Sequence, residues 1–359
     1  MEYYLFASNN CNLGCRYCSV LRKDSKEIPI NPIFSVHELL NFIKIVQTQE
    51  DEKNVDIVFF GGEPTLNYPY IYHIIDSLKS INYIYNIRFF LHTNGLLLHE
   101  IDTDYLDNFY QIILSINYEM IDKENLNNLY FSRILKNIAY VKSKSNVSIL
   151  GRLTITEKTS LYTNVLQVCD FFDSIYWQIE NKSCFDNYNE FYKNYLFELN
   201  MLWNHWLGLY EKGILLNMIP FTHYLNYLKG NNSTSSPLCG YNIDAIYIRN
   251  DGKCFSCPEE MDNDNFSVGN IKKGKLHFMR NEQYTVCSDC ISFPICRGRC
   301  GRMHKSFTPD QRLNYCKLNK IMFSLFENNK ESLKKILMNK KSYESIISNT
   351  CFSITECIP

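Results

Sequence analysis

The sequence predicts an α/β protein: a partial (β/α)6 barrel of the TIM type, followed by a small cysteine-rich domain and a C-terminal helical tail. Three observations support this prediction. In the first half, short β-rich apolar runs alternate with amphipathic helical stretches, which is typical of parallel strands joined by crossover helices. Polar motifs directly follow several of these runs. Of the fifteen cysteines, three lie at 11–18 and eight at 239–316.

The predicted barrel consists of six strands and the helices between them. The strands are expected at 2–8, 55–60, 86–91, 110–116, 147–155 and 174–180, and the helices near 36–49, 69–80, 102–108, 125–144 and 160–171. Right-handed crossovers between such units curl a parallel sheet into a barrel. The carboxyl ends of the strands then share one rim, where functional residues gather.

The second half of the sequence predicts helices and a cysteine-rich segment whose folding depends on bound metal. Aromatic and apolar residues recur every three or four positions through 187–212, which favours a helix whose stripe packs on the barrel or the next domain. The polar run NNSTSSP marks a boundary. The cysteine-rich segment has too little apolar periodicity for a core of its own, as expected where metal ligation replaces hydrophobic burial. The expected regions are a barrel at 1–185, a helical bridging region at 186–238, the cysteine-rich domain at 239–316, and a Lys-rich helix and tail at 317–359.

Composition excludes several function classes. The chain has 37 Lys and Arg against 38 Asp and Glu, so it carries no electrostatic footprint for a nucleic acid. It has neither a long apolar run nor an export signal, so we expect a cytoplasmic protein that does not enter a membrane. Disulfides do not persist in that reducing compartment, and the many cysteines therefore favour metal or cluster ligation.

The first cysteines are spaced as Cys11-x3-Cys15-x2-Cys18, directly after the first strand. Iron–sulfur clusters are held by thiolates, and three protein thiolates leave one iron of a four-iron cluster open. Gly14 permits the close backbone path that a loop around a cluster needs. A zinc site with a distant fourth ligand is the alternative, although this is not a usual zinc spacing.

This spacing, with Tyr17 before the last cysteine, resembles the motif of the radical S-adenosylmethionine (radical SAM) superfamily. The stretch Gly61-Gly62-Glu63-Pro64 resembles the family's GGE motif, whose acidic residue and backbone engage the amino group of SAM. The resemblance implies that SAM binds the open iron and is cleaved to a 5′-deoxyadenosyl radical, which takes hydrogen from a substrate.

Further polar residues match positions that surround the SAM carboxylate and ribose in similar enzymes. These residues are Thr93, Asn94, Ser115 and Arg152. Ordinary capping or hydrogen bonding in the core is the alternative for them. For His92 and Gln178 we expect that structural role.

The second group of cysteines resembles the SPASM domain, an extension that carries two auxiliary [4Fe-4S] clusters in many radical SAM enzymes. The spacing is Cys239-x12-Gly252-x4-Cys257, then Cys287-x2-Cys290-x5-Cys296-x3-Cys300, and finally Cys316. The resemblance implies that Cys287, Cys290, Cys296 and Cys316 hold the distal cluster. It implies that Cys239, Cys257 and Cys300 hold the cluster nearer the barrel.

Two points about this second group stay open. Cys254 is a candidate fourth ligand of the cluster nearer the barrel, whereas in some relatives that cluster has an open iron that receives a substrate thiolate. A zinc ribbon built on Cys254-x2-Cys257 and Cys287-x2-Cys290 is the alternative to both clusters, but it would leave four cysteines of the motif without a role.

The resemblance also implies a class of substrate. SPASM enzymes act mostly on ribosomally made peptides, so we expect SAM, three [4Fe-4S] clusters, an electron donor such as ferredoxin or flavodoxin, and a peptide that gains a thioether or carbon–carbon crosslink or a related oxidation. Because the chain starts at the first strand, leader recognition is expected from a separate protein, the bridging region or the tail.

Other activities remain as alternatives. Sulfatase maturases, which make formylglycine, place an aspartate directly after the cysteine that corresponds to Cys257. Here Pro258 follows, and Glu259 is the candidate catalytic base. Radical chemistry on a small molecule and a zinc-binding interaction module are further alternatives. Cys351 and Cys357 fall in a polar terminus that we expect to be disordered, with a plug or extra cluster ligand as the other interpretation.

Overall fold

The computed structural model describes residues 1–18, 28–81, 84–116, 129–214, 216–230, 238–278, 287 and 289–338. The chain divides into two compact units. The first unit comprises Met1–Ser115, Leu129–Ile149 and Gly240–Asn281, and the second comprises Ile116–Asn128, Leu150–Cys239 and Glu282–Pro359. Cys351 and Cys357 lie outside the described residues.

The first unit is built on a sheet around β1 (Glu2–Ser8), in which every residue is buried. On one side the parallel strands β2 (Asn54–Gly61), β3 (Asn86–Thr93) and β4 (Phe109–Ile116) follow in that order. On the other side β1 pairs in parallel with β7 (Ala245–Ile248). A strand that is buried throughout is typical of a parallel sheet with both faces covered.

Short antiparallel strands continue this sheet beyond β7. They are β8 (Lys253–Phe255), β9 (Gly269–Asn270) and β10 (Lys275–Leu276). These strands were not among those predicted from the sequence. The apolar side chains of β7 and β8, such as Ile246 and Phe255, are buried. The first part of the cysteine-rich segment, which lacked apolar periodicity for its own core, therefore joins the sheet of the first unit, whereas the part from Glu282 onward belongs to the second unit.

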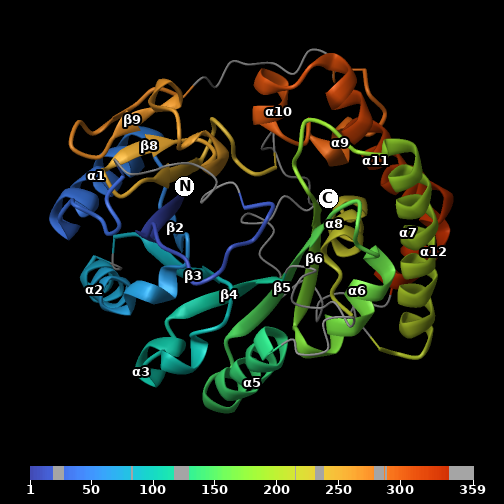
Figure 1. The fold of residues 1–359 in the computed structure, drawn as a ribbon, viewed down its shortest axis with the longest axis horizontal. Coiled ribbons are helices and arrows are strands. Elements are labelled where there is room, and N and C mark those ends of the chain that lie inside the picture. The colour runs from blue at the N-terminus through green and yellow to red at the C-terminus, as the bar shows by residue number, and fades with distance from the viewer. Residues whose placement is uncertain are drawn as a thin grey trace. The chain divides into compact units, whose positions relative to one another are not determined.

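The helices of the first unit follow its strands. They are α1 (Val36–Glu50), α2 (Tyr68–Lys79), α3 (Thr103–Leu106) and α5 (Leu129–Lys144). Helix α1 begins at a capping box, in which Glu38 N–H donates to Ser35 Oγ and Ser35 N–H donates to the Glu38 carboxylate. Figure 1 shows α1 and α2 side by side next to β2 and β3. Short 3-10 turns occur at Pro64–Asn67, Leu98–Glu100, Pro258–Glu260 and Asp264–Phe266.

The second unit contains the last two barrel strands, β5 (Ser148–Ile155) and β6 (Ser174–Ile179), which pair in parallel. Its helices are α6 (Leu161–Val168), α7 (Tyr188–Glu211), α8 (Ile219–Leu228), α9 (Phe293–Cys296), α10 (Gly301–Ser306), α11 (Pro309–Asn328) and α12 (Lys330–Met338), with a 3-10 turn at Cys169–Phe171. Figure 1 shows α7 running alongside α11.

An aromatic core joins the helices of the second unit. The ring of Trp203 on α7 lies 5.1 Å from that of Phe221 on α8 and 5.8 Å from that of Phe326 on α11. These side chains are nearly or fully buried, as are Trp206 and Tyr195 of α7. The predicted apolar stripe of α7 therefore packs into this core. Aromatic contacts of this kind stabilise a core beyond their buried area.

The predicted fold class is confirmed. All six predicted barrel strands are present, and their ends differ from the predicted ends by no more than two residues. Helix α11 begins at Pro309, earlier than the predicted tail, because Thr308 and Gln311 form a capping box there. Cys316 consequently lies within a helix. Among the described residues, each helix is too short or too polar to cross a lipid bilayer.

Candidate active site and cluster sites

The three N-terminal cysteines lie on the loop that follows β1. Cys11, Cys15 and Cys18 are partly exposed and form no disulfide with the described residues. Leu13 N–H donates to the sulfur of Cys11 over 3.4 Å, and Cys18 N–H donates to the carbonyl of Cys15 over 3.1 Å. Burial raises the pKa of Cys11, and the Leu13 N–H opposes that rise. The loop thus presents three thiols at the carboxyl end of a buried strand, where sheets of this kind place their functional groups.

The Gly61-Gly62 pair packs directly against the start of this cysteine loop. Gly62 N–H donates to the Ser8 carbonyl over 3.0 Å, and Glu63 N–H donates to the Asn10 carbonyl over 2.8 Å. A Cβ atom added to Gly62 would lie 2.4 Å from the Asn10 oxygen. Only glycine allows this approach of two backbones, because any side chain would displace the loop.

Glu63 connects the ends of β2 and β3. Its carboxylate is 1% exposed and accepts hydrogen bonds from the Thr65 N–H and hydroxyl, the Thr93 hydroxyl at 2.6 Å, and the Asn94 N–H at 2.8 Å. Burial raises the pKa of Glu63, and the hydrogen bonds from Asn94, Thr65 and Thr93 oppose that rise. Three of these four donors bond to Oε1, and the Asn94 N–H bonds to Oε2.

Asn94 links the end of β3 to the cysteine loop. Its side-chain nitrogen donates to Asn12 Oδ1 over 2.7 Å and lies 3.9 Å from the sulfur of Cys11. The sequence placed these residues 82 and 83 positions apart, and the parallel pairing of β1, β2 and β3 brings them together. Cys11, Glu63, Thr93 and Asn94 therefore form one continuous set of contacts.

The other predicted SAM contacts are divided between the two units. Pro64 begins the 3-10 turn after Glu63, and Tyr17 lies on the cysteine loop, partly exposed. Ser115 Oγ on β4 lies 2.8 Å from His92 Nε2 on β3. In the second unit, Arg152 on β5 donates to Gln178 on β6. His92 and Gln178, expected to be structural, are the hydrogen-bond partners of two predicted SAM contacts.

The chemistry of the cysteine loop fits an iron–sulfur cluster. Its donors are three thiols on one short loop, and backbone and side-chain N–H groups approach the sulfur of Cys11, as is common around cluster thiolates. Among the described residues, no three His, Cys, Asp or Glu side chains gather around the position of a single metal ion.

Four of the downstream cysteines gather in the second unit. Burial is the main cause that raises the pKa of Cys287, Cys296 and Cys316, and for each of these thiols neighbouring cysteines of this group add to the rise. The pKa of Cys296 reaches about 12. Cys290 N–H donates to the Cys287 carbonyl over 3.1 Å, which closes the turn between these two. We call Cys287, Cys290, Cys296 and Cys316 the four-cysteine site.

Polar and cationic side chains surround the four-cysteine site. Asn319 donates to the sulfur of Cys296 over 3.6 Å. Lys320, Arg299 and Arg312 oppose the rise in the pKa of Cys316. Cations and N–H donors near thiols favour the thiolate, which is the form that binds metal.

The candidate ligands of the cluster nearer the barrel are divided between the units. Cys239 and Cys300 belong to the second unit, and Cys254 and Cys257 to the first. Cys257 lies immediately before the Pro258–Glu260 turn, and Cys300 immediately before α10.

Cys254 has a different setting from the other candidate ligands. It is fully buried on β8, and its thiol donates to the Gly252 carbonyl over 3.8 Å. Burial raises its pKa well above the ordinary range, and its charge would raise the pKa of Tyr3, whose ring packs on Phe42 of α1. The next residue, Phe255, belongs to a cluster on the opposite face of the sheet. Cys254 therefore points into the core below α1.

The two glutamates after Cys257 differ in burial. Glu259, the candidate base, is partly exposed, whereas Glu260 is buried and accepts a hydrogen bond from the Tyr241 hydroxyl over 2.7 Å. Glu259 was named from the sequence, but the burial of Glu260 was not predicted. Two adjacent glutamates in a short turn are a weak signal, because only one of them can be solvated when the turn packs on a core.

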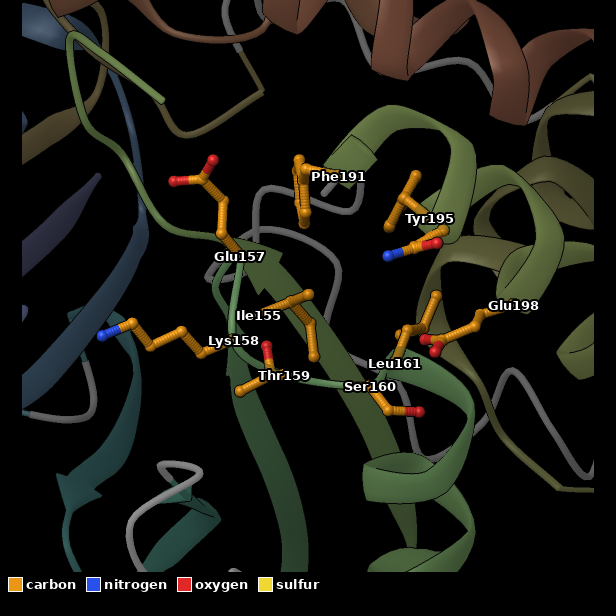
Figure 2. Close-up of a pocket in the computed structure, with 10 residues that line it drawn as sticks. Ile155, Glu157, Lys158, Thr159, Ser160, Leu161, Phe191, Tyr195 and Glu198 are labelled. Carbon is orange, nitrogen blue, oxygen red and sulfur yellow. The ribbon is translucent and has the colours of Figure 1, made fainter. Parts of the chain in front are cut away.

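A cavity of about 220 Å³ opens in the second unit at the carboxyl end of β5. Figure 2 shows Phe191 and Tyr195 of α7 opposite the loop that carries Glu157 and Thr159. The lining residues are Ile155, Glu157, Lys158, Thr159, Ser160, Leu161, Phe191, Asn194, Tyr195 and Glu198. The cavity was not predicted from the sequence, although its position after a barrel strand was a usable signal.

Comparisons with known proteins agree with this architecture. A model of the radical SAM superfamily matches residues 5–163. The cysteine-type anaerobic sulfatase-maturating enzyme of Clostridium novyi is 24% identical over 328 residues, which cover 82% of this chain and 86% of the relative. The radical SAM cyclopropyl synthase TigE of Paramaledivibacter caminithermalis is 26% identical over 227 residues, which cover 58% of this chain and 46% of TigE.

Solved structures share the fold. Native anSMEcpe with bound AdoMet aligns with a TM-score of 0.73 and 22% identity, over 94% of this chain and 99% of that one. The structure of anSMEcpe with AdoMet and the Cp18Cys peptide aligns with a TM-score of 0.71 over the same shares. The α/β barrel and the cysteine-rich region that follows it are thus an arrangement already known in solved structures.

Proposed function

We propose that the protein is a radical SAM peptide maturase, and the match of residues 5–163 to a model of the radical SAM superfamily supports this proposal. In this proposal the substrate is a ribosomally made peptide. A bound [4Fe-4S] cluster and SAM would supply the radical chemistry that removes a hydrogen atom from one residue of this peptide. The enzyme itself holds and orients these groups and excludes water from them.

The contacts that join Glu63, Asn94 and Cys11 carry this proposal. Cys11, Cys15 and Cys18 would hold the cluster and leave one iron for SAM. The Glu63 carboxylate and the Gly61-Gly62 backbone would face the amino group of SAM. Because Glu63 is held by the ends of β2 and β3, its position depends on the same loop contacts that place the thiols. The remaining proposed SAM contacts are Tyr17, Pro64, Thr93, Asn94, Ser115 and Arg152.

We propose that the four-cysteine site holds a second [4Fe-4S] cluster. The mutual effect of its thiols on their pKa values and the nearby cations support this assignment. A third cluster would be held by Cys239, Cys257 and Cys300. Cys254 is buried in the core below α1, which supports a ligand set without it. The third cluster would then have an open iron.

The relatives support a peptide substrate. One relative is a sulfatase-maturating enzyme, and anSMEcpe has been solved with the Cp18Cys peptide. We propose a crosslink or a related oxidation as the product, with Glu259 as the proton acceptor. Formylglycine formation is the second candidate, because the match to the sulfatase-maturating enzyme covers 86% of its length. A cytoplasmic location and an electron donor such as flavodoxin or ferredoxin are part of the proposal.

The test is turnover of a candidate precursor by anaerobically reconstituted enzyme. We expect about twelve irons per chain, which corresponds to three four-iron clusters, and 5′-deoxyadenosine when reductant and SAM are present. Mass spectrometry of the peptide then distinguishes the products: a loss of two hydrogens indicates a crosslink or dehydrogenation, and conversion of a cysteine to an aldehyde indicates formylglycine. Undiminished SAM cleavage by Cys15→Ala, or zinc in place of iron, would contradict the proposal.

A further inference from the structure

Tyr315, which precedes Cys316 on α11, is tied to the loop at residues 180–187. Its hydroxyl accepts a hydrogen bond from Lys182 N–H over 2.9 Å and lies 2.8 Å from the carbonyl oxygens of both Glu180 and Lys182, to which it donates. Tyr315 is 2% exposed. The loop follows directly on β6 and ends where α7 begins. One buried side chain therefore fixes the backbone at the carboxyl end of a barrel strand.

The same loop holds two walls of the cavity in Figure 2. The Glu157 carboxylate accepts hydrogen bonds from Asp186 N–H at 2.9 Å and Asn187 N–H at 2.7 Å, and it pairs with the Lys182 ammonium. The ring of Phe185 stacks on that of Phe191 at a centroid distance of 5.4 Å. Glu157 and Phe191 both line the cavity. If the loop moves, both walls lose their supports.

On its other side, the Tyr315 ring contacts Arg299, which is bonded to the backbone of Cys296. The Arg299 guanidinium lies over the Tyr315 ring at 4.8 Å, and Arg299 N–H donates to the Cys296 carbonyl over 2.8 Å. The ring also contacts Phe185 of the loop at 5.4 Å. Contacts thus run without a gap from Cys296 through Arg299 and Tyr315 to the loop.

We propose that Tyr315 is a positioning residue that makes the loop at 180–187, and with it the cavity at the end of β5, depend on the four-cysteine site. Loading of that site orders the first turns of α11, and Tyr315 transmits this order to the loop. The cavity lies where parallel α/β sheets bind their substrates, so the site affects the walls of a substrate pocket without contacting the substrate. The inference rests on the proposed cluster at the four-cysteine site.

Hydrogen exchange of the full-length, anaerobically reconstituted enzyme tests the inference. The variant Tyr315→Phe keeps the ring contacts and removes the hydroxyl. We expect peptides that cover residues 180–187 to exchange about five times faster, the factor that corresponds to the loss of one hydrogen bond worth ~1 kcal/mol. Its iron content should equal that of the unmodified protein. The matched control is Tyr224→Phe, which removes a tyrosine hydroxyl bonded to Glu327 at the other end of α11 and should leave the loop unchanged.

A second variant tests dependence on the cluster. Cys316→Ser should lose about four irons per chain and show the same faster exchange at 180–187, and Tyr315→Phe should add little to it. Unchanged protection of the loop in Tyr315→Phe, or in a Cys316→Ser variant that has lost its iron, overturns the inference. Full iron content in Cys316→Ser would instead reject the proposed cluster and the dependence of the loop on that cluster. The role of the Tyr315 hydroxyl is decided by Tyr315→Phe alone.

Discussion

The side-chain amide of Asn319 donates to the sulfur of Cys296 over 3.6 Å, from one turn beyond Cys316 on the same helix. Asn319 is 7% exposed, so water competes little for this bond. N–H donors to the sulfurs of an iron–sulfur cluster stabilise its more negative, reduced state and raise its reduction potential. In the proposed cluster, Asn319 therefore has an electronic effect in addition to its packing.

The variant Asn319→Leu tests this effect. Leucine has a similar volume but no donor, so the reduction potential of the cluster at the four-cysteine site should fall while the iron content stays the same. An EPR-monitored redox titration measures the potential. Asn200→Leu, a substitution of the same kind at an exposed position of α7, is the control. An unchanged potential in Asn319→Leu would contradict the role assigned to the amide.

Glu63→Gln should weaken SAM binding by about tenfold or more and destabilise the fold by roughly 2 kcal/mol, which is the scale for hydrogen bonds to a buried charged group. The amide replaces an acceptor oxygen by a donor in a pocket that already contains the donors of Thr65, Thr93 and Asn94. Equilibrium binding of SAM and urea unfolding measure the two effects.

The control for this prediction is Glu52→Gln. The Glu52 carboxylate also accepts backbone N–H bonds, from Lys53 and Asn54, but it lies on the surface before β2. If both variants bound SAM as the unmodified protein does, Glu63 would have no part in the SAM site.

Cys254→Ala and Cys257→Ala should differ in iron content. Cys257→Ala should lose about four irons, because the proposed cluster nearer the barrel depends on it. Cys254→Ala should keep them and lose only stability, since its thiol is buried below α1. Iron and sulfide analysis of anaerobically purified protein decides this, and equal iron loss in both variants would return Cys254 to the ligand set.

We expect the folded protein to lose stability on acidification because of His223. Burial lowers its pKa from 6.5 to about 4, partly opposed by a hydrogen bond with the Ile295 backbone. The unfolded chain takes up the proton near pH 6.5 and the folded chain only near pH 4. The stability from this group is therefore present above pH 6.5 and is lost as the pH falls toward 4, by about 2 kcal/mol between pH 8 and pH 5.

Urea unfolding at several pH values measures this effect. The difference between the unmodified protein and His223→Gln should change over this range, because the variant lacks the titrating group. His37→Gln, at an exposed position, should show the pH dependence of the unmodified protein. A parallel pH dependence in His223→Gln would rule out His223 as the cause.

The sequence predicted the barrel strands closely because hydrophobic periodicity and β-branched or aromatic content are local properties. Strand 2–8 was predicted with the ends it has, and Cys11-x3-Cys15-x2-Cys18 identified the first site. The strands β7 and β8 were missed for the same reason. They are only four and three residues long. A longer run of apolar residues would have indicated a strand, but β8 has a cysteine, Cys254, at its central position.

The sequence by itself determined the order of the elements, the spacing of the cysteines and the rim on which the first three lie. Tertiary structure decided which of these groups meet. Glu63 reaches Thr93 and Asn94 because β2 and β3 are parallel neighbours, and Tyr315 reaches Lys182 because α11 packs in the second unit. Tertiary structure also decided that Cys254 faces the core. Consecutive residues of a strand point to opposite faces of the sheet, and the register of β8 against β7 determines which face Cys254 takes. The spacing of residues is a property of the sequence. The pairing of strands and the direction of side chains depend on contacts between residues that are far apart in the sequence.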